Sequence, residues 1–172
     1  MRSFFWRLGR KLYCVARRER ANDPQSNGEY WLLEKILSTQ RGCNNLVLMD
    51  IGANIGDWSE QARSGLLAHR ISGRVVAFEP ACSTFKVLNA RFAGDQQITC
   101  TNIALSSASG ESDFYIVEEL AGTNSLYAMD GSRIEKVRRQ SLDDFMAEAH
   151  LPHVAFAKCD TEGHDLDVTL GF

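Results

Sequence analysis

A carboxylate and two glycines directly follow an apolar run in the first third of the chain. The run at residues 46–49 leads to Asp50, and Gly52 and Gly56 follow that carboxylate by two and six positions. An apolar strand that leads into a glycine-rich turn and then a helix is how α/β sheets hold nucleotide-like ligands. Both glycines lack a Cβ, so the backbone can bend tightly there and approach a ligand closely.

The spacing of these residues discriminates between cofactors. Gly52, Asn54 and Gly56 form a Gly-x-Asn-x-Gly pattern, which differs from the Gly-x-Gly-x-x-Gly of dinucleotide binders. Asp50 would suit a cationic or hydroxyl-bearing ligand, to which a carboxylate can offer hydrogen-bond acceptors. The pattern therefore favours S-adenosylmethionine over a nicotinamide dinucleotide.

A second acidic residue closes the next predicted strand. Residues 74–79 are expected to be extended and to end at Glu79, and Pro80 then stops the strand. An acid at this place, about two dozen residues after the first turn, binds ribose hydroxyls in such folds. A solvated strand end is the alternative for Glu79 alone. With the glycine-rich turn ahead of it, we expect Glu79 to accept from both hydroxyls of an unphosphorylated ribose.

Four segments together resemble the FkbM-type methyltransferase family. They are residues 47–79 with Phe-Glu-Pro at 78–80, Asn-Ile-Ala-Leu-Ser at 102–106, Ser-Leu-Asp at 141–143, and Lys-Cys-Asp-Thr-Glu-Gly-His at 158–164. The resemblance covers roughly residues 30–172, and its last motif is the most specific. It implies a Rossmann-like class I methyltransferase fold, S-adenosyl-L-methionine as cofactor, and methyl transfer to a hydroxyl of a sugar, glycolipid or secondary metabolite.

Predicted helices and strands alternate along the chain. Helices are expected at 29–39, 57–69, 82–93 and 141–149, and strands at 46–50, 74–79, 97–101 and 154–159. This alternation is typical of a parallel α/β sheet flanked by helices and joined by right-handed crossovers. Two further segments, 112–118 and 136–140, predict an antiparallel excursion within the same domain.

Polar residues are expected to gather where the parallel strands end. Ligands of open α/β sheets bind outside the carboxyl ends of the strands. The predicted elements bring Asp50, Glu79, Asn102 and Asp160 to that edge. Asp50 and Gly52 would then lie near the methionine part of the cofactor, Glu79 at the ribose, and residues 102–104, with Asn102 and Ala104, near the adenine.

Three nearby residues are candidates for a general base, which assists a hydroxyl nucleophile. Asp160, Glu162 and His164 alternate, so they would point to the same side if the strand continued through Gly163. A histidine that starts a helix without a catalytic role is an equally good interpretation of His164. A separate polar loop predicts that Asn124 and Ser125 line the acceptor pocket.

Composition and charge restrict the class of partner. The chain has 172 residues and a net charge of −3, but residues 1–20 carry +6, which leaves −9 on the rest. An acidic domain argues against nucleic acid as substrate, so a small-molecule or glycan acceptor is expected. The five cysteines have neither metal-ligand nor disulfide-framework spacing, which favours no metal and a reducing, cytoplasmic setting.

The first 28 residues form a basic amphipathic leader and linker ahead of the domain expected at 29–172. Phe5, Leu8, Leu12 and Val15 recur at helical spacing among basic residues. The segment is too short and too charged to span a bilayer. Three interpretations stay open: a helix that packs on the domain, a frayed leader, and a helix that lies on an anionic membrane surface, which would make the protein membrane-peripheral.

The sequence stops where a helix is expected to follow the fourth parallel strand. A complete class I domain, as the resemblance implies it, has further strands, so we expect a C-terminally truncated domain with little turnover. Strand 154–159 would be an exposed edge that favours self-association. A non-catalytic remnant or cofactor-binding module of the same fold is the alternative, and a nucleotide-dependent oxidoreductase is less favoured.

Overall fold

The computed structural model describes residues 2–17, 24–116, 126 and 132–172. The chain divides into two units, residues 1–40 and 41–172. The first unit contains helix α1 (Arg2–Arg17) and helix α2 (Glu29–Thr39), and α2 has the bounds predicted from the sequence. Within the described residues, none of the helices combines the length and the apolar character that a membrane span requires.

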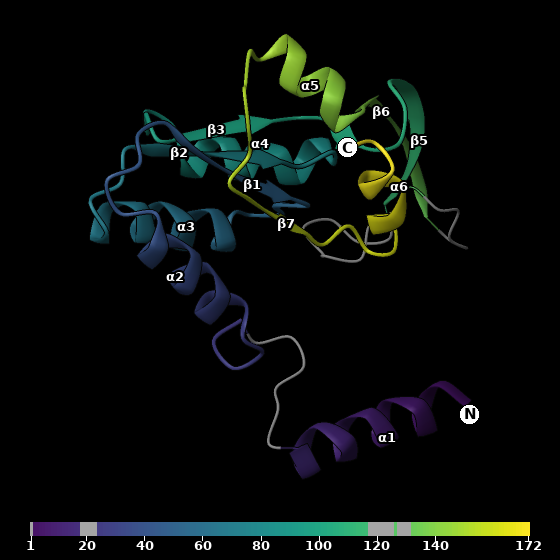
Figure 1. Ribbon diagram of the computed structural model, residues 1–172. Coiled ribbons are helices and arrows are strands. Elements are labelled where there is room, and N and C mark those ends of the chain that lie inside the picture. The colour runs from purple at the N-terminus through teal and green to yellow at the C-terminus, as the bar shows by residue number, and fades with distance from the viewer. Residues whose placement is uncertain (1, 18–23, 117–125, 127–131) are drawn as a thin grey trace. The chain divides into compact units, whose positions relative to one another are not determined.

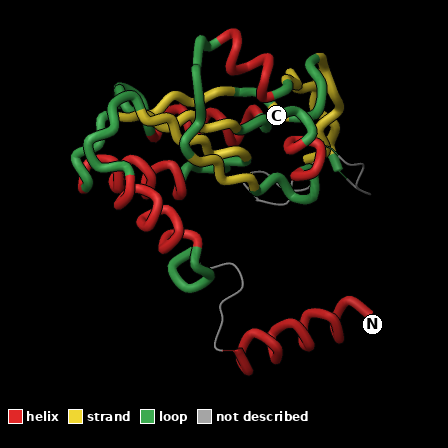
Figure 2. Tube along the Cα trace, viewed as in Figure 1, coloured by secondary structure: helices red, strands yellow, loops and turns green. Residues whose placement is uncertain are grey.

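A four-stranded sheet forms the centre of the second unit (Figure 1). Its order is β3-β2-β1-β7, and every neighbouring pair is parallel. The strands are β1 (Leu46–Ile51), β2 (Gly73–Phe78), β3 (Ile98–Thr101) and β7 (Phe156–Cys159). Helices alternate with them along the chain (Figure 2): α3 (Asp57–Ala68), α4 (Cys82–Arg91), α5 (Leu142–Glu148) and α6 (Asp165–Thr169). The predicted parallel α/β fold is confirmed.

Helices cover both faces of this sheet, and Figure 1 shows α5 and α3 on opposite sides. Strand β1 is buried along its whole length, and its side chains alternate between the faces. Met49 and Ile51 join the core cluster that includes Leu142 of α5 and Val168 of α6. Asp50 has the opposite parity, and its carboxylate meets Ser59 of α3. This alternation decides which residues reach the candidate site.

A second sheet with the order β4-β6-β5 packs beside the first. Its strands are β4 (Ala104–Leu105), β5 (Gly110–Ile116) and β6 (Arg133–Gln140). β5 and β6 are antiparallel, as predicted, whereas β4 is parallel to β6 and is too short to show a sequence pattern. The predicted acceptor residues Asn124 and Ser125 lie outside the described residues. Glu135 of β6 accepts a hydrogen bond from the backbone N–H of Cys82 at 2.9 Å, which ties this sheet to the start of α4.

Strand β7 is shorter than predicted. It begins at Phe156 and ends at Cys159, and the chain then turns, with Glu162 at φ 53° and Gly163 at φ 99°. The condition under which Asp160, Glu162 and His164 would share one side, an extended strand through Gly163, is therefore not met. Gly163 can take this left-handed conformation because it has no Cβ, and the turn redirects the chain into α6.

Candidate active site

The turn after β1 has a left-handed backbone at the three predicted positions. Gly52, Asn54 and Gly56 have φ angles of 78°, 50° and 89°. A Cβ on Gly52 would lie 2.0 Å from the carbonyl oxygen of Asp160, so only glycine fits there. The N–H groups of Gly52 and Ala53 both donate to the carbonyl of Phe78, at 3.1 and 2.9 Å. The turn is thereby fixed between the ends of β2 and β7.

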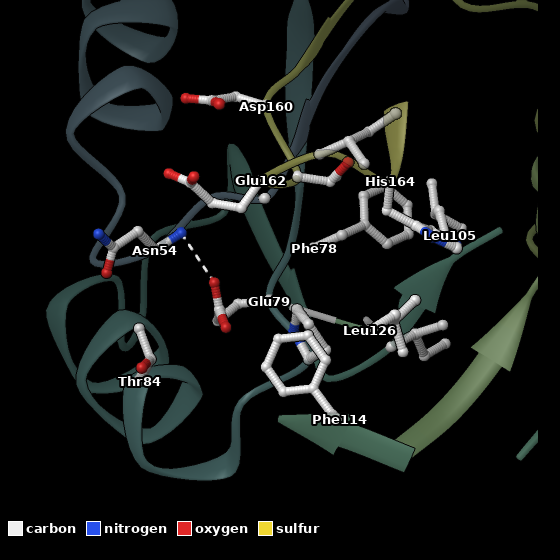
Figure 3. Close-up of a pocket in the computed structure, with 15 residues that line it drawn as sticks. Asn54, Phe78, Glu79, Thr84, Leu105, Phe114, Leu126, Asp160, Glu162 and His164 are labelled. Carbon is white, nitrogen blue, oxygen red and sulfur yellow. Dashed lines mark hydrogen bonds between the residues drawn. The ribbon is translucent and has the colours of Figure 1, made fainter. Parts of the chain in front are cut away.

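Glu79 lies at this junction, with 7% of its surface exposed. One carboxylate oxygen accepts from the Asn54 N–H at 3.0 Å (dashed in Figure 3), and the other accepts from the Ala81 N–H at 2.9 Å. Burial raises the pKa of Glu79 to about 7, although these two backbone N–H groups oppose the shift. Each carboxylate oxygen has a second lone pair, so Glu79 retains capacity to accept from a ligand hydroxyl.

Asp50 lies behind the turn and does not line the pocket. Its carboxylate is fully buried and accepts from the Ser59 hydroxyl at 2.7 Å. The other oxygen is 3.2 Å from the ammonium nitrogen of Lys158. The expected contact between Asp50 and the methionine part of the ligand needs correction, because the parity of β1 turns this side chain toward α3.

Lys158 is a site residue that the sequence reasoning missed. Its ammonium group donates to the Gly52 carbonyl at 3.2 Å and lies 3.9 Å from a carboxylate oxygen of Asp160. Asp50 and Lys158 are register partners on the adjacent parallel strands β1 and β7. The lysine at the start of the motif 158–164 was the available signal, and pairing the predicted strands would have placed it beside Asp50. Lys158 thus holds the glycine turn in place through its hydrogen bond to the Gly52 carbonyl.

Asn102 and Ala104 support the pocket rather than line it. The Asn102 amide donates to the carbonyls of Glu79 and Pro80, at 2.8 and 2.9 Å, and so holds the end of β2. Ala104 is buried in the core cluster of the second sheet. Their neighbours Ile103 and Leu105 line the pocket instead. The segment therefore borders the pocket through Ile103 and Leu105, whereas the side chains of Asn102 and Ala104 do not line it, and its place beside the adenine stays a prediction.

The pocket is open and encloses about 590 Å³ of empty space, part of it continuous with solvent. One side carries polar groups and the other is apolar, as Figure 3 shows. Glu79, Asp160 and Glu162 are its three carboxylates, and no lysine or arginine is among the described residues that line it. The described residues that line it are Ile51, Gly52, Asn54, Phe78, Glu79, Pro80, Thr84, Ile103, Leu105, Phe114, Leu126, Asp160, Thr161, Glu162 and His164.

Two of the three base candidates present carboxylates at the pocket. The Asp160 side chain is 69% exposed, and Glu162 lies beside it on the turn after β7. Burial raises the pKa of Glu162, and the negative charges of Asp160 and Asp165 raise it further. A carboxylate with a raised pKa is a stronger proton acceptor than an unperturbed one. The surroundings of Glu162 therefore strengthen its carboxylate as a proton acceptor.

His164 is engaged on both ring nitrogens. Nε2 lies 3.0 Å from the hydroxyl of buried Ser106, and Nδ1 lies 3.2 Å from a carboxylate oxygen of Asp167. Burial lowers the pKa of His164, although the charge of Asp167 opposes this shift. The residue occupies the N-cap position of α6, which agrees with the helix-start interpretation. Its imidazole contributes to the pocket wall and contacts Ser106, which directly follows β4.

Comparisons with known proteins agree with this geometry. A family model described as Methyltransferase FkbM domain matches residues 50–170, more than half of the chain. The matched segment contains every residue of the pocket lining. A comparison with curated proteins finds no match.

Proposed function

The chain belongs to the FkbM methyltransferase family, and we propose that it transfers a methyl group from S-adenosyl-L-methionine to a hydroxyl oxygen. The observation that carries the proposal is the junction of Glu79 with the Gly52–Gly56 turn, at the carboxyl ends of β1 and β2. In open α/β sheets this location receives the ribose of a nucleoside cofactor. The family assignment identifies the protein as a methyltransferase; the cofactor and the oxygen acceptor are inferred from the site.

The groups that line the pocket fit a cationic nucleoside better than a dinucleotide. Three carboxylates line the part of the pocket that the structure describes, without a lysine or an arginine, so a pyrophosphate would meet repulsion without compensation. A sulfonium, an ammonium group and ribose hydroxyls would each find an acceptor there. When bound, S-adenosylmethionine supplies a methyl group on a positively charged sulfur that needs no further activation.

Individual residues can be assigned roles in holding this cofactor. Glu79 would accept hydrogen bonds from the ribose hydroxyls, because its carboxylate is anchored by two backbone N–H groups and so is already oriented. Gly52 allows the backbone to pass close to the ligand, and Lys158 holds the carbonyl of that residue. Ile103 and Phe78 offer the apolar surface that an adenine ring requires.

The acceptor hydroxyl would lose its proton to Glu162, with Asp160 keeping the site negative. A positioned base contributes about 10²–10⁴-fold to such a reaction, and alignment of the acceptor contributes on the order of 7–11 kcal/mol at best.

Asp160→Asn, at the adjacent carboxylate, is the matched control for Glu162→Gln. We expect the larger loss of kcat from Glu162→Gln.

The acceptor is proposed to be a small molecule or glycan with both apolar and hydroxyl groups. The apolar wall formed by Leu105, Phe114 and Leu126 lies across the pocket from Asp160 and Glu162, with Glu79 between them. A sugar, a glycolipid or a secondary-metabolite hydroxyl combines the two characters. A phosphorylated acceptor is disfavoured by the negative charge of the lining.

Calorimetric titration of the chain with S-adenosylmethionine, S-adenosylhomocysteine and NAD⁺ tests the cofactor assignment. We expect both sulfur ligands to bind and NAD⁺ to bind more weakly than either. Tighter binding of NAD⁺ would overturn the methyl-donor assignment in favour of oxidoreductase chemistry. If neither sulfur ligand binds to a folded chain, the result would favour a domain that has lost the ability to bind this cofactor.

A further inference from the structure

Helix α1 is a single uninterrupted helix of 16 residues (Figures 1 and 2). Its described aliphatic side chains are largely exposed. Leu8, Leu12 and Val15 have 43%, 61% and 68% of their surface exposed. Single exposed apolar residues need no explanation, but three on one helix require a closer look at their arrangement.

These three residues lie on one face of α1. Successive residues of an α-helix are rotated by about 100°, so positions 8, 12 and 15 fall within an arc of roughly 60°. Basic residues occupy much of the rest of the helix: Arg2, Arg7, Arg10, Lys11 and Arg17. No acidic residue lies between Arg2 and Arg17. The helix therefore combines a stripe of described apolar side chains with a sequence whose charged residues are all cationic.

The charge of this segment contrasts with that of the rest of the protein. Residues 1–20 carry a net charge of +6, whereas the remainder carries −9. A helix with an apolar stripe and a basic polar face lies in the interface of an anionic bilayer, where its cations meet lipid phosphates. The stripe is too short and the helix too charged for a transmembrane span.

We propose that α1 docks this protein onto an anionic lipid bilayer, with Leu8, Leu12 and Val15 inserted at the boundary between headgroups and acyl chains. Charge complementarity selects this partner, because the helix offers cations without any competing anion. Leu8, Leu12 and Val15 are not among the described residues that line the pocket, and the proposal does not depend on the proposed function. It would hold the enzyme at the surface where lipid-linked acceptors reside.

Co-sedimentation of the full chain with lipid vesicles tests the proposal. The probes are vesicles of phosphatidylcholine alone and vesicles that also contain phosphatidylglycerol. We expect binding to the anionic vesicles to be about tenfold or more stronger than to the neutral ones. Raising the salt concentration should weaken this binding, because the screening length falls from about 10 Å at 0.1 M to about 3 Å at 1 M.

Matched variants test whether vesicle binding depends on the apolar stripe of α1 or on exposed apolar and charged residues in general. Leu12→Glu should weaken binding to anionic vesicles by about tenfold or more, whereas Leu67→Glu, on the exposed face of α3, should leave it unchanged. The double variant Lys11→Glu with Arg17→Glu should also weaken binding to anionic vesicles by about tenfold or more. Arg74→Glu with Lys86→Glu changes the net charge equally at exposed sites in the second unit and should have little effect.

Three outcomes would overturn membrane docking by α1. The first is equal binding to neutral and anionic vesicles, and the second is unchanged binding of Leu12→Glu. The third is stronger binding to a duplex DNA probe than to anionic vesicles, which would indicate a nucleic-acid surface. Thermal unfolding of Leu12→Glu should match that of Leu67→Glu, so that a loss of binding cannot be attributed to misfolding.

Discussion

Glu79 is a buried carboxylate with both oxygens already held by backbone N–H groups, which makes it a pre-oriented acceptor. We predict that Glu79→Ala weakens binding of S-adenosylhomocysteine by about 1.5–3 kcal/mol for each charge-assisted hydrogen bond lost. Glu111→Ala, at an exposed acid of β5, is the matched control and should bind normally. Unchanged affinity in a folded Glu79→Ala protein, measured by calorimetry, would remove this residue from the site.

The raised pKa of Glu79 predicts a specific pH dependence of stability. Its pKa is about 7 in the folded protein, against 4.5 without the fold. Because the folded state binds this proton more tightly, the contribution of Glu79 to the free energy of unfolding is greatest below pH 4.5 and falls as the pH rises to about 7. The loss is roughly 3 kcal/mol at most.

Urea unfolding of the wild type and of Glu79→Gln across this pH range measures that contribution. We expect the stability difference between the two proteins to shift in favour of the glutamine variant as the pH rises. A difference that stays constant from about pH 5 to about pH 8 would show that Glu79 titrates as an ordinary carboxyl group.

Lys158 and Asp50 form a buried ion pair beneath the glycine turn. Removal of one partner leaves the other charge uncompensated, so Lys158→Met should lower the free energy of unfolding by about 3–5 kcal/mol. Asp50→Asn added to Lys158→Met should restore part of that loss. The matched control is Lys136→Met, which breaks the exposed pair with Asp113 and should change stability little. Equal effects of the two lysine substitutions on urea unfolding would contradict the buried-pair interpretation.

At the scale of elements, the sequence predicts the parallel strands well, since long apolar runs bounded by turn residues identify buried strands. Residues 46–50, 74–79 and 97–101 match β1, β2 and β3 to within one residue at each end. Side-chain direction was harder to predict. Asp50 faces α3 and Asn102 folds back onto β2, because strand parity and local hydrogen bonds decide which groups reach the pocket.

Two features escaped sequence reasoning for physical reasons. Strand β4 has only two residues, so it carries no periodicity, and it exists because its edge pairs with β6. The sequence left open whether the chain continues as a strand through Gly163, and the structure instead has a turn in which Glu162 and Gly163 adopt positive φ. Only Gly163 signals such a conformation, and a glycine is compatible with an extended strand as well. Tertiary contacts decided both features.

The glycine turn gives a prediction at the element scale. Gly52→Ala would place a Cβ 2.0 Å from the Asp160 carbonyl, and it would also strain a residue with φ 78°. Gly94 has nearly the same backbone, φ 83°, but open space around it, which makes Gly94→Ala the matched control. We expect Gly94→Ala to cost about 1–2 kcal/mol of stability and Gly52→Ala to cost about 1–3 kcal/mol more. Equal losses in the free energy of unfolding for the two variants would show that the turn can move away from the end of β7 without penalty.

At the scale of the whole molecule, β7 is an edge of the four-stranded sheet within the described residues. Leu166 and Leu170, which follow it, are 70% and 65% exposed. Unpaired edges and adjacent apolar side chains favour pairing with a second chain. We predict concentration-dependent self-association in sedimentation velocity. Leu166→Lys with Leu170→Lys should reduce it, whereas Leu67→Lys, at an exposed leucine of α3, should not. A monomer at all concentrations would contradict this prediction.

The central claim is that the pocket between the ends of β1, β2 and β7 binds the methyl donor. Hydrogen–deuterium exchange of the full chain, with and without saturating S-adenosylhomocysteine, tests it most directly because the readout is local. We predict slower exchange in the peptides that cover residues 51–56, 79–84 and 160–164, with little change in α2 and α5. Binding of S-adenosylhomocysteine without protection of these segments, or with protection confined to other parts of the chain, would contradict the account.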